Sequence, residues 1–242
     1  MAMNKESNSY TTGFAIALVV VVGTILASIS MGLKPIQQKN AAKKKRMDIL
    51  GAIKVESTRK TVDDIFKEHI KDGYLVDARG MKIEGSNLEA AEKKDIKKEF
   101  RNTGVSPEER EYPIYTAEVD GEKLFILPMV GKGLWGPIWG YVAVKSNMRD
   151  IQAAKFDHKT ETPGLGAEIK VYKTFQEQFE KGKQISNDNG EFVKMVVTKG
   201  SGGEGNPYAV DGITGGTITS KGVEEMLERS LQVYVKHFQT LK

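Results

Sequence analysis

The chain contains no cysteine, and this absence removes several kinds of chemistry. Cysteine-ligated iron–sulfur clusters, c-type haem attachment and thiol nucleophiles are all excluded within it. Histidine is scarce as well, and the three that are present, His69, His158 and His237, have no metal-ligand spacing between them. No metal site is therefore predicted, and no serine or carboxylate pair indicates a hydrolase.

The net charge is also small, since the 242 residues carry a formal net charge of only +4. Part of that excess lies in the run Lys43, Lys44, Lys45 and Arg46, beside an apolar segment, where it suits lipid head groups better than nucleic acid. Nucleic acid is therefore not predicted as a partner. The hydrophobic share of 39% and the charged share of 28% are those of a folded protein, and the length suits one folded body.

One long apolar run stands near the N-terminus. Residues 13–33 carry no charge, and at about 1.5 Å per helical residue they span roughly the hydrocarbon thickness of a bilayer. A cleaved signal peptide is the alternative, because Ala27-Ser28-Ile29-Ser30 imitates a cleavage site, but its n-region would be more basic than Lys5 alone. The predicted organisation is a short N-terminal segment (1–12), a transmembrane helix (13–33), a juxtamembrane segment (34–60) and a soluble domain (61–242).

Basic residues flank the apolar run unequally. Lys34, Lys39 and the cluster at 43–46 follow it, whereas only Lys5 precedes it. Loops rich in lysine and arginine stay on the cytoplasmic side of a membrane. Charge alone therefore predicts a cytoplasmic soluble domain.

The remaining chain mixes helical and strand-like patterns. Short apolar runs between residues 112 and 157, separated by turns such as Asp120-Gly121, predict an antiparallel meander. Apolar residues at three- and four-residue spacing from Val223 to Phe238 predict an amphipathic C-terminal helix. Further segments are predicted as helices over 40–53, 61–71, 87–101 and 173–181 and as a strand over 192–199. The predicted fold class is α+β, an antiparallel sheet with flanking helices after one membrane helix.

A glycine- and threonine-rich segment leads into the C-terminal helix. Residues 211–220 read DGITGGTITS, so small residues surround several hydroxyl groups where the helix begins. Unpaired N–H groups and the positive end of the helix dipole favour phosphate at such a place. The alternative is an ordinary helix cap, with Thr219 or Ser220 satisfying the first turn.

The run DGITGGT resembles the flavinylation motif of the FMN-binding subunits of sodium-translocating NADH:quinone reductase and of the related Rnf complex. The resemblance implies that Thr217 takes FMN through a phosphoester bond made by an FAD-dependent flavin transferase. It also implies that Asp211 belongs to what the transferase recognises. Gly216 stands where alanine is usual. The other residues that the resemblance places near the cofactor are Thr214, Gly215, Gly216, Thr219 and Ser220.

A second segment, residues 158–166, reads HKTETPGLG and is similar to another signature of this family. Pro163 and the two glycines predict a tight turn, whose alternative role is merely to join a strand to a helix. Together with the threonine motif, this resemblance implies that Leu165 packs against the flavin ring. The same resemblance places Glu161, Thr162, Gly164 and Gly166 near it.

A third segment, Gly131-Lys-Gly-Leu-Trp-Gly136, matches the spacing of a dinucleotide fingerprint but lacks its context. Pro137 and a strand-like run follow Gly136, whereas the fingerprint requires a helix there. The segment resembles instead the Gly-x-Gly-x-Trp-Gly pattern of the same family. Trp135 is thus expected to stack on or edge the flavin, with Gly136 opening room for it; the alternative is a core tryptophan at a hairpin.

The family resemblance implies a redox subunit that relays electrons from an iron centre to the flavin of a neighbouring membrane subunit. Its expected partners are the other subunits of the respiratory complex, the flavin transferase and the lipid bilayer. It also implies the bacterial inner membrane and a periplasmic soluble domain, against the charge count. Length and the GKGLWGP hairpin fit the C subunit of the reductase better than the G subunit of Rnf. A membrane-anchored FMN-binding regulatory module and a cofactor-free scaffold are the remaining alternatives.

Overall fold

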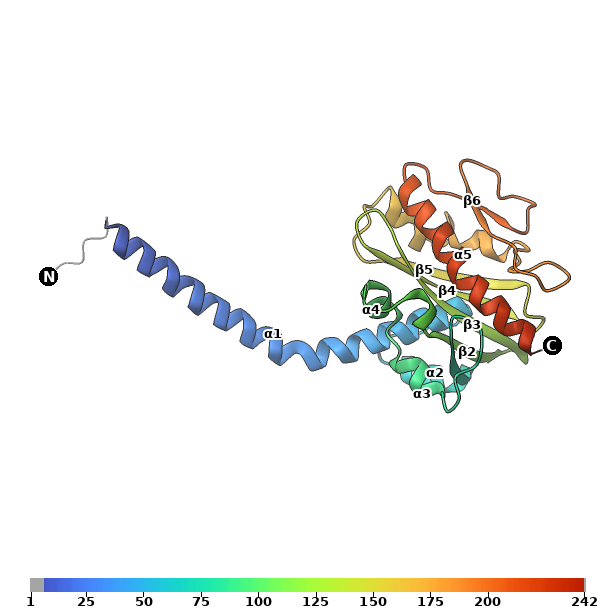
Figure 1. The fold of residues 1–242 in the computed structure, drawn as a ribbon, viewed down its shortest axis with the longest axis horizontal. Coiled ribbons are helices and arrows are strands. Elements are labelled where there is room, and N and C mark those ends of the chain that lie inside the picture. Colours follow the sequence, from blue (N-terminus) through green and yellow to red (C-terminus); the bar gives the residue numbers. More distant parts are fainter. Residues whose placement is uncertain (1–6, 242) are drawn as a thin grey trace. The chain divides into compact units, whose positions relative to one another are not determined.

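The computed structural model describes residues 7–241, which divide into two compact units after Lys45. Helix α1 (Asn8–Ala52), blue in Figure 1, runs from the first unit into the second and continues through Pro35. The helices predicted over 13–33 and 40–53 are therefore parts of one helix. Its apolar stretch is long enough to cross a membrane, and no part of that stretch is buried inside the protein.

The second unit begins earlier than the predicted start of the soluble domain at residue 61. Ile49, Leu50 and Ala52, in the last turns of α1, are completely buried in a hydrophobic core. The Arg46 guanidinium, at the first residue of the unit, pairs with Asp63 at 2.9 Å and with Glu92 at 2.6 Å. Residues 46–60 thus belong to the folded domain, because the apolar residues from Ile49 to Ile53 help to fill its core.

Five antiparallel strands form the central sheet in chain order. They are β1 (Ile70–Val76), β2 (Tyr112–Val119), β3 (Glu122–Lys132), β4 (Pro137–Lys145) and β5 (Ile151–His158). The meander predicted between 112 and 157 is confirmed. Asp120 and Gly121 make its first hairpin turn with φ of +52° and +79°. The sheet also contains β1, which was not predicted: the helix predicted over 61–71 ends at His69, and residues 70–76 pair with β2.

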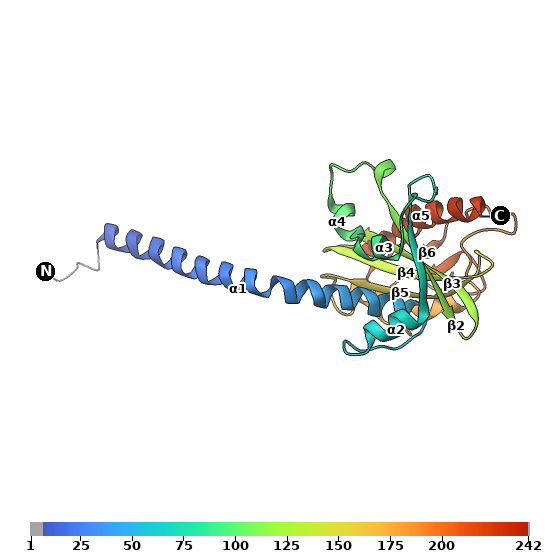
Figure 2. The same cartoon turned by 90° about the horizontal axis from the view of Figure 1, so that it is seen from below.

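The sheet is covered on both faces (Figure 2). Helix α5 (Thr217–Thr240) packs on one face, while the end of α1, α2 (Val62–His69) and α3 (Leu88–Lys93) pack on the other. Along β3, Phe125 and Leu127 belong to the first core and Leu124 and Ile126 to the second. The alternation of side chains across a strand thus explains why β3 is apolar almost without interruption.

Several shorter segments differ from their predictions. The helix predicted over 87–101 is two helices, α3 and α4 (Ile96–Arg101), because Asp95 accepts hydrogen bonds from Lys97 N–H and Lys98 N–H and starts the second. The predicted strand 192–199 keeps only β6 (Val196–Thr198), paired in parallel with β7 (Ala209–Asp211). The remaining short elements are the 3-10 helices η1 (Pro107–Glu109), η2 (Gly166–Lys170) and η3 (Gln176–Glu180), the last within the predicted helix 173–181.

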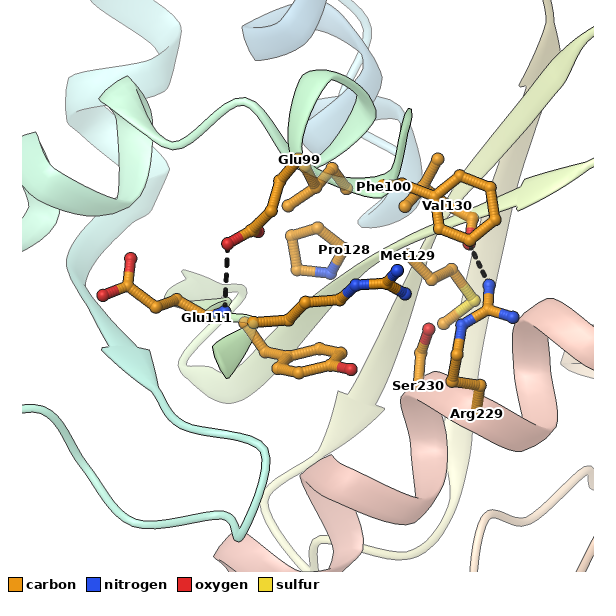
Figure 3. A pocket seen from close by; sticks show the side chains of 11 residues that line it. Glu99, Phe100, Glu111, Pro128, Met129, Val130, Arg229 and Ser230 are labelled. Atoms are coloured by element: carbon orange, nitrogen blue, oxygen red, sulfur yellow. Dashed lines mark hydrogen bonds between the residues drawn. The ribbon is translucent and has the colours of Figure 1, made fainter. Parts of the chain in front are cut away.

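Helix α4 is held near α5 by an arginine and an aromatic ring (Figure 3). The Arg229 guanidinium of α5 donates to Val130 O at 2.6 Å and lies 4.8 Å from the centre of the Phe100 ring. Arg110 lies 5.4 Å from the same ring. Burial lowers the pKa of Arg229, and the positive charge of Arg110 adds to this effect. The small cavity that these side chains line lies where α4, β3 and α5 meet.

His237 near the end of α5 is almost completely buried and has two hydrogen-bond partners. Gly80 O lies 2.8 Å from Nδ1, and the Tyr74 hydroxyl lies 3.0 Å from Nε2. Because a carbonyl only accepts, Nδ1 carries the proton and Nε2 accepts from Tyr74. Burial lowers the pKa of His237, and the charge of Lys82 acts in the same direction.

Acidification is expected to destabilise the domain through this histidine. As the pH falls below the ordinary histidine value of about 6.5, the unfolded chain binds a proton that folded His237 resists, until the pH reaches the lowered pKa. The free energy of unfolding of the full chain in detergent, measured by urea titration, should therefore fall over this range. His237→Gln should cost about 1–3 kcal/mol at pH 8 and remove part of the pH dependence. His69→Gln, which changes a half-exposed histidine outside the core, is the matched control and should cost less than about 1 kcal/mol.

Candidate functional site

A single buried carboxylate joins three segments of the chain. Glu161 lies in the turn after β5 and is 5% exposed. Its oxygens accept hydrogen bonds from the N–H groups of Leu134 at 3.2 Å, Trp135 at 2.9 Å and Gly136 at 3.2 Å. The Thr219 hydroxyl in the first turn of α5 donates to it at 2.5 Å. Glu161 therefore connects the tip of the β3–β4 hairpin, its own turn and the start of α5.

The hydrogen bonds keep this carboxylate ionised. Burial alone would raise the pKa of Glu161, but the bonds from Thr219 and from the three N–H groups outweigh burial and lower it. A hydrogen bond that stabilises the charged form acts in this direction. The negative charge also lies beside the N-terminal turn of α5, where the helix dipole is favourable to an anion.

Glycines make this close approach possible. A Cβ atom on Gly133 would lie 2.6 Å from Glu161 Oε1, and one on Gly166 would lie 2.7 Å from Glu161 Oε2. Both distances are too short for real contacts, so a larger residue at either position would push the carboxylate away from its donors. The glycines of the hairpin and of the second motif thus serve the packing around Glu161.

Thr217 is the first residue of α5, and its side chain is exposed. The first helical hydrogen bond runs from Ser220 N–H to Gly216 O at 2.8 Å. Among residues 7–241, the N–H groups of Thr217, Ile218 and Thr219 have no acceptor. Such a helix start favours a phosphate group.

The alternative of a simple helix cap is wrong. Gly216 precedes α5 and no side chain caps its first turn. The Thr219 hydroxyl donates to Glu161, and Ser220 Oγ accepts from Ile213 N–H at 3.0 Å. Both hydroxyl groups are thus committed to holding neighbouring segments in place.

A cleft of about 210 Å³ lies beside Thr217. Residues of all three sequence motifs line it: Leu134, Trp135, Glu161, Thr162, Leu165, Gly166, Gly215, Gly216, Thr217, Ile218 and Thr219. Trp135 is 67% exposed, so the alternative of a core tryptophan is wrong. Leu134 and Ile218 were not predicted. They are next to predicted residues in the sequence, but only the folding of the three segments brings them to the cleft.

Five of the predicted residues lie outside the lining of the cleft: Asp211, Thr214, Gly164, Ser220 and Gly136. Asp211 Oδ1 accepts from the N–H groups of Gly202 at 2.8 Å and Gly203 at 2.7 Å, so it shapes the preceding glycine-rich loop. Gly164 has a φ of +76° at the tip of its turn. Its N–H donates to Glu168.

His158 supports the turn that carries Glu161. Its Nδ1 accepts from Glu161 N–H at 3.1 Å, while Nε2 is buried without a hydrogen-bond partner among the described residues. Burial lowers the pKa of His158, and the charge of Lys170 adds to this effect. The neutral ring that accepts at Nδ1 is therefore favoured.

A buried lysine that the sequence analysis missed holds the other side of the glycine-rich loop. Lys183 is 2% exposed, and its ammonium donates to Gly203 O at 2.5 Å and to Asn206 O at 2.8 Å. Burial lowers the pKa of Lys183. No local signal could have revealed this role, because Lys183 stands in an ordinary polar stretch of the sequence.

The geometry suits FMN. An exposed hydroxyl stands beside unpaired N–H groups that favour a phosphate, and an apolar cleft that includes Trp135 and Leu165 opens next to it. Among the described residues no group of histidine, aspartate and glutamate side chains could hold a metal ion. The arrangement suits a phosphate at the start of α5 with an aromatic ring beside it.

The comparisons with known proteins agree with this geometry. Residues 133–232 match the family model of the FMN-binding domain. The C subunit of the Na(+)-translocating NADH-quinone reductase of Vibrio alginolyticus is 31% identical, covering 94% of this chain and 92% of that protein. The same subunit of Neisseria meningitidis serogroup B is 29% identical, covering 91% and 88%.

Two crystal structures are similar over most of the chain. The C subunit of the Na(+)-translocating NADH-quinone reductase from Parabacteroides distasonis is 41% identical, with a TM-score of 0.73, and covers 85% of this chain and 96% of its own. NqrC of Shewanella oneidensis is 26% identical, with a TM-score of 0.64, and covers 82% and 94%.

Removal of the Glu161 carboxylate should destabilise the domain strongly. Glu161→Ala leaves three N–H groups and one hydroxyl without their acceptor, so the free energy of unfolding should fall by about 2–4 kcal/mol. Urea titration of the full chain in detergent, followed by tryptophan fluorescence, measures it. Glu168→Ala, which removes a half-exposed carboxylate from the same turn, should cost less than about 1 kcal/mol. Equal stability of the two variants would contradict the role assigned to Glu161.

Proposed function

Because the chain belongs to the family of the C subunits of the Na(+)-translocating NADH-quinone reductases, we propose that it carries FMN covalently on Thr217 and relays electrons within such a complex. The observation that carries the proposal is the meeting of three motifs at one cleft beside an exposed threonine hydroxyl. FMN, when bound, supplies one-electron chemistry. Each relative compared above is a C subunit, which favours the reductase over the Rnf complex.

The residues of the cleft divide the work of holding the cofactor. Thr217 Oγ provides the ester oxygen, and the N–H groups of the first turn of α5 are available to the phosphate oxygens. Trp135 and Leu165 offer apolar contact to the flavin ring from two different segments. Glu161 acts indirectly, because it fixes the hairpin, the turn and the helix start relative to one another.

Glycine at position 216 leaves the attachment site open. A Cβ there would lie 3.1 Å from two atoms of the Ile213 side chain, which is tight but requires only a small shift. The alanine that is usual in the family's motif is therefore compatible with this backbone. Gly215, with φ of +77°, turns the chain into the helix immediately before.

The maturation partner in this proposal is a flavin transferase that recognises the segment around Asp211. Asp211 supports that role through structure, because its carboxylate accepts from Gly202 N–H, Gly203 N–H and, at 3.2 Å, from the Thr198 hydroxyl. These bonds hold the glycine-rich loop beside the threonine motif. An ordered loop beside Thr217 suits an enzyme that must bind this segment and transfer FMN to Thr217.

The remaining partners follow from the membrane helix and the family. We assign α1 to the bacterial inner membrane, with its basic residues near lipid head groups, and the folded domain to the periplasmic side, next to the other redox subunits. This orientation opposes the count of Lys34, Lys39 and the 43–46 cluster against Lys5. The charge rule is statistical, and partner subunits can set the orientation of a chain.

Replacement of Thr217 should abolish covalent flavin. The full chain, produced in a host that contains the transferase, should show a fluorescent band under ultraviolet light after denaturing electrophoresis. Thr217→Ala should lose that band completely, because the ester oxygen is gone. Thr214→Ala changes another exposed hydroxyl of the same motif and should keep the band. A band that persists in Thr217→Ala would refute the attachment site.

The orientation of the domain is tested by proteolysis of intact spheroplasts. Trypsin should degrade the folded domain from outside, because the proposal places it on the periplasmic face. A cytoplasmic marker protein in the same cells should remain intact. Protection of the domain until the membrane is opened would show that the charge count, and not the family, gives the topology.

A further inference from the structure

Exposed apolar side chains concentrate around the cleft. From residue 46 to residue 241, eight large hydrophobic side chains are exposed, and four of them border or line the cleft. These four are Leu134 at 44%, Trp135 at 67%, Leu165 at 42% and Ile218 at 57%. The other four, Met81, Tyr172, Val196 and Leu241, do not line the cleft. A cluster of this kind marks an interaction surface.

The charges around this cluster have one sign. In segments 131–137, 158–170 and 212–223, which form the cleft, every exposed charged side chain is a lysine: Lys132, Lys159, Lys170 and Lys221. The two acidic residues of these segments are Glu161, which is buried, and Glu168, which is half-exposed and accepts from Gly164 N–H. The next exposed carboxylate along α5 is Glu225.

These four lysines differ from several others in the domain. Within residues 7–241 none of them forms an ion pair, whereas Lys54, Lys93, Lys94 and Lys194 each pair with a glutamate. Their backbones lie next to the cleft segments. Lys159 N–H donates to Pro137 O, and Gly222 packs against the Lys132 carbonyl. We call these four lysines, which belong to the segments that form the cleft and are not in ion pairs within the described part of the chain, the basic rim.

We propose that this surface, which consists of the flavin contacted by Trp135 and Leu165, the adjacent Leu134 and Ile218, and the four lysines, docks a redox protein whose own face carries carboxylates around an apolar patch. The inference rests on the proposed FMN at Thr217. An apolar centre with a polar rim is the anatomy of a transient protein interface. Charge complementarity raises the rate of encounter with the right partner more than it raises affinity. Attachment to a membrane is already provided by α1, so a protein partner is favoured over a lipid surface.

The test uses an acidic one-electron carrier, reduced plant-type ferredoxin, as the probe. Anaerobic stopped-flow mixing with the full chain, carrying its covalent flavin in detergent, follows flavin reduction. The second-order rate constant should fall at least tenfold between 20 mM and 300 mM salt, because salt screens the attraction. The radical of a viologen with a single sulfonate group, which has no net charge, should reduce the flavin at a rate that changes little with salt.

Charge reversal locates the effect on the surface. The combined variant K132E/K159E/K170E/K221E should lower the ferredoxin rate constant at 20 mM salt at least tenfold and leave the viologen rate nearly unchanged. The matched control K60E/K67E/K98E/K145E makes the same change of net charge at exposed lysines elsewhere. It should retain most of the ferredoxin rate. Equal losses in the two variants would overturn the proposal, because net charge alone would then explain the rate.

Further outcomes distinguish this docking surface from three alternatives: the absence of the cofactor, a role of the lysines in maturation and a lipid-binding surface. A missing flavin band in the wild-type chain would refute the proposed cofactor itself, whereas a band missing only from the rim variant would assign the lysines to maturation and overturn the docking surface. An unchanged ferredoxin rate, combined with loss of binding to phosphatidylglycerol vesicles in the rim variant, would identify a lipid-binding surface instead.

Discussion

The Glu161 carboxylate is the interaction on which the rest of the site depends. A chain without cysteine has no disulfide with which to join distant segments, and here one carboxylate joins the hairpin tip, the turn after β5 and the first turn of α5. An ionised carboxylate offers about four acceptor positions, and four donors point at this one. Burying the charge is tolerable because each donor compensates part of its lost hydration. Thr217 stands two residues before one of those donors, Thr219, so its position is set by the same bonds.

The contact between the sheet and α5 fixes the segments that Glu161 joins. A Cβ on Gly131 would lie 2.8 Å from Met226 Cβ, and Gly222 packs against the Lys132 carbonyl, so α5 lies directly on the end of β3. The Tyr234 hydroxyl donates to Pro128 O at 2.5 Å further along the same strand. Because both the start and the body of α5 are attached to β3, the threonine motif cannot shift without disturbing the core. The first-turn N–H groups therefore present a fixed site for an anion.

Periodicity predicted the parts of this fold that local sequence determines. The meander and the C-terminal helix were readable because their side chains alternate or recur on one face, and the three motifs were readable because their residues are contiguous. β1 and β7 were missed, and the strand predicted over 192–199 was too long, since the pairing of these strands depends on partners far along the chain. The role of Glu161 was equally hidden: its donors are backbone N–H groups of Leu134, Trp135 and Gly136, and any residue except proline supplies such a group.

The openness of the cleft can explain why the cofactor would need the proposed covalent bond. The volume of about 210 Å³ is below the roughly 300–1,000 Å³ of pockets that enclose a ligand, and no residue that lines the cleft is cationic. A helix start contributes only about 0.3–1 kcal/mol to holding an exposed anion, so such a site would bind free FMN weakly. Closing the cleft would strengthen binding but would separate the flavin from its redox partners. The phosphoester proposed on Thr217 would remove dissociation while leaving the cleft open, so that the cofactor would be both permanent and accessible.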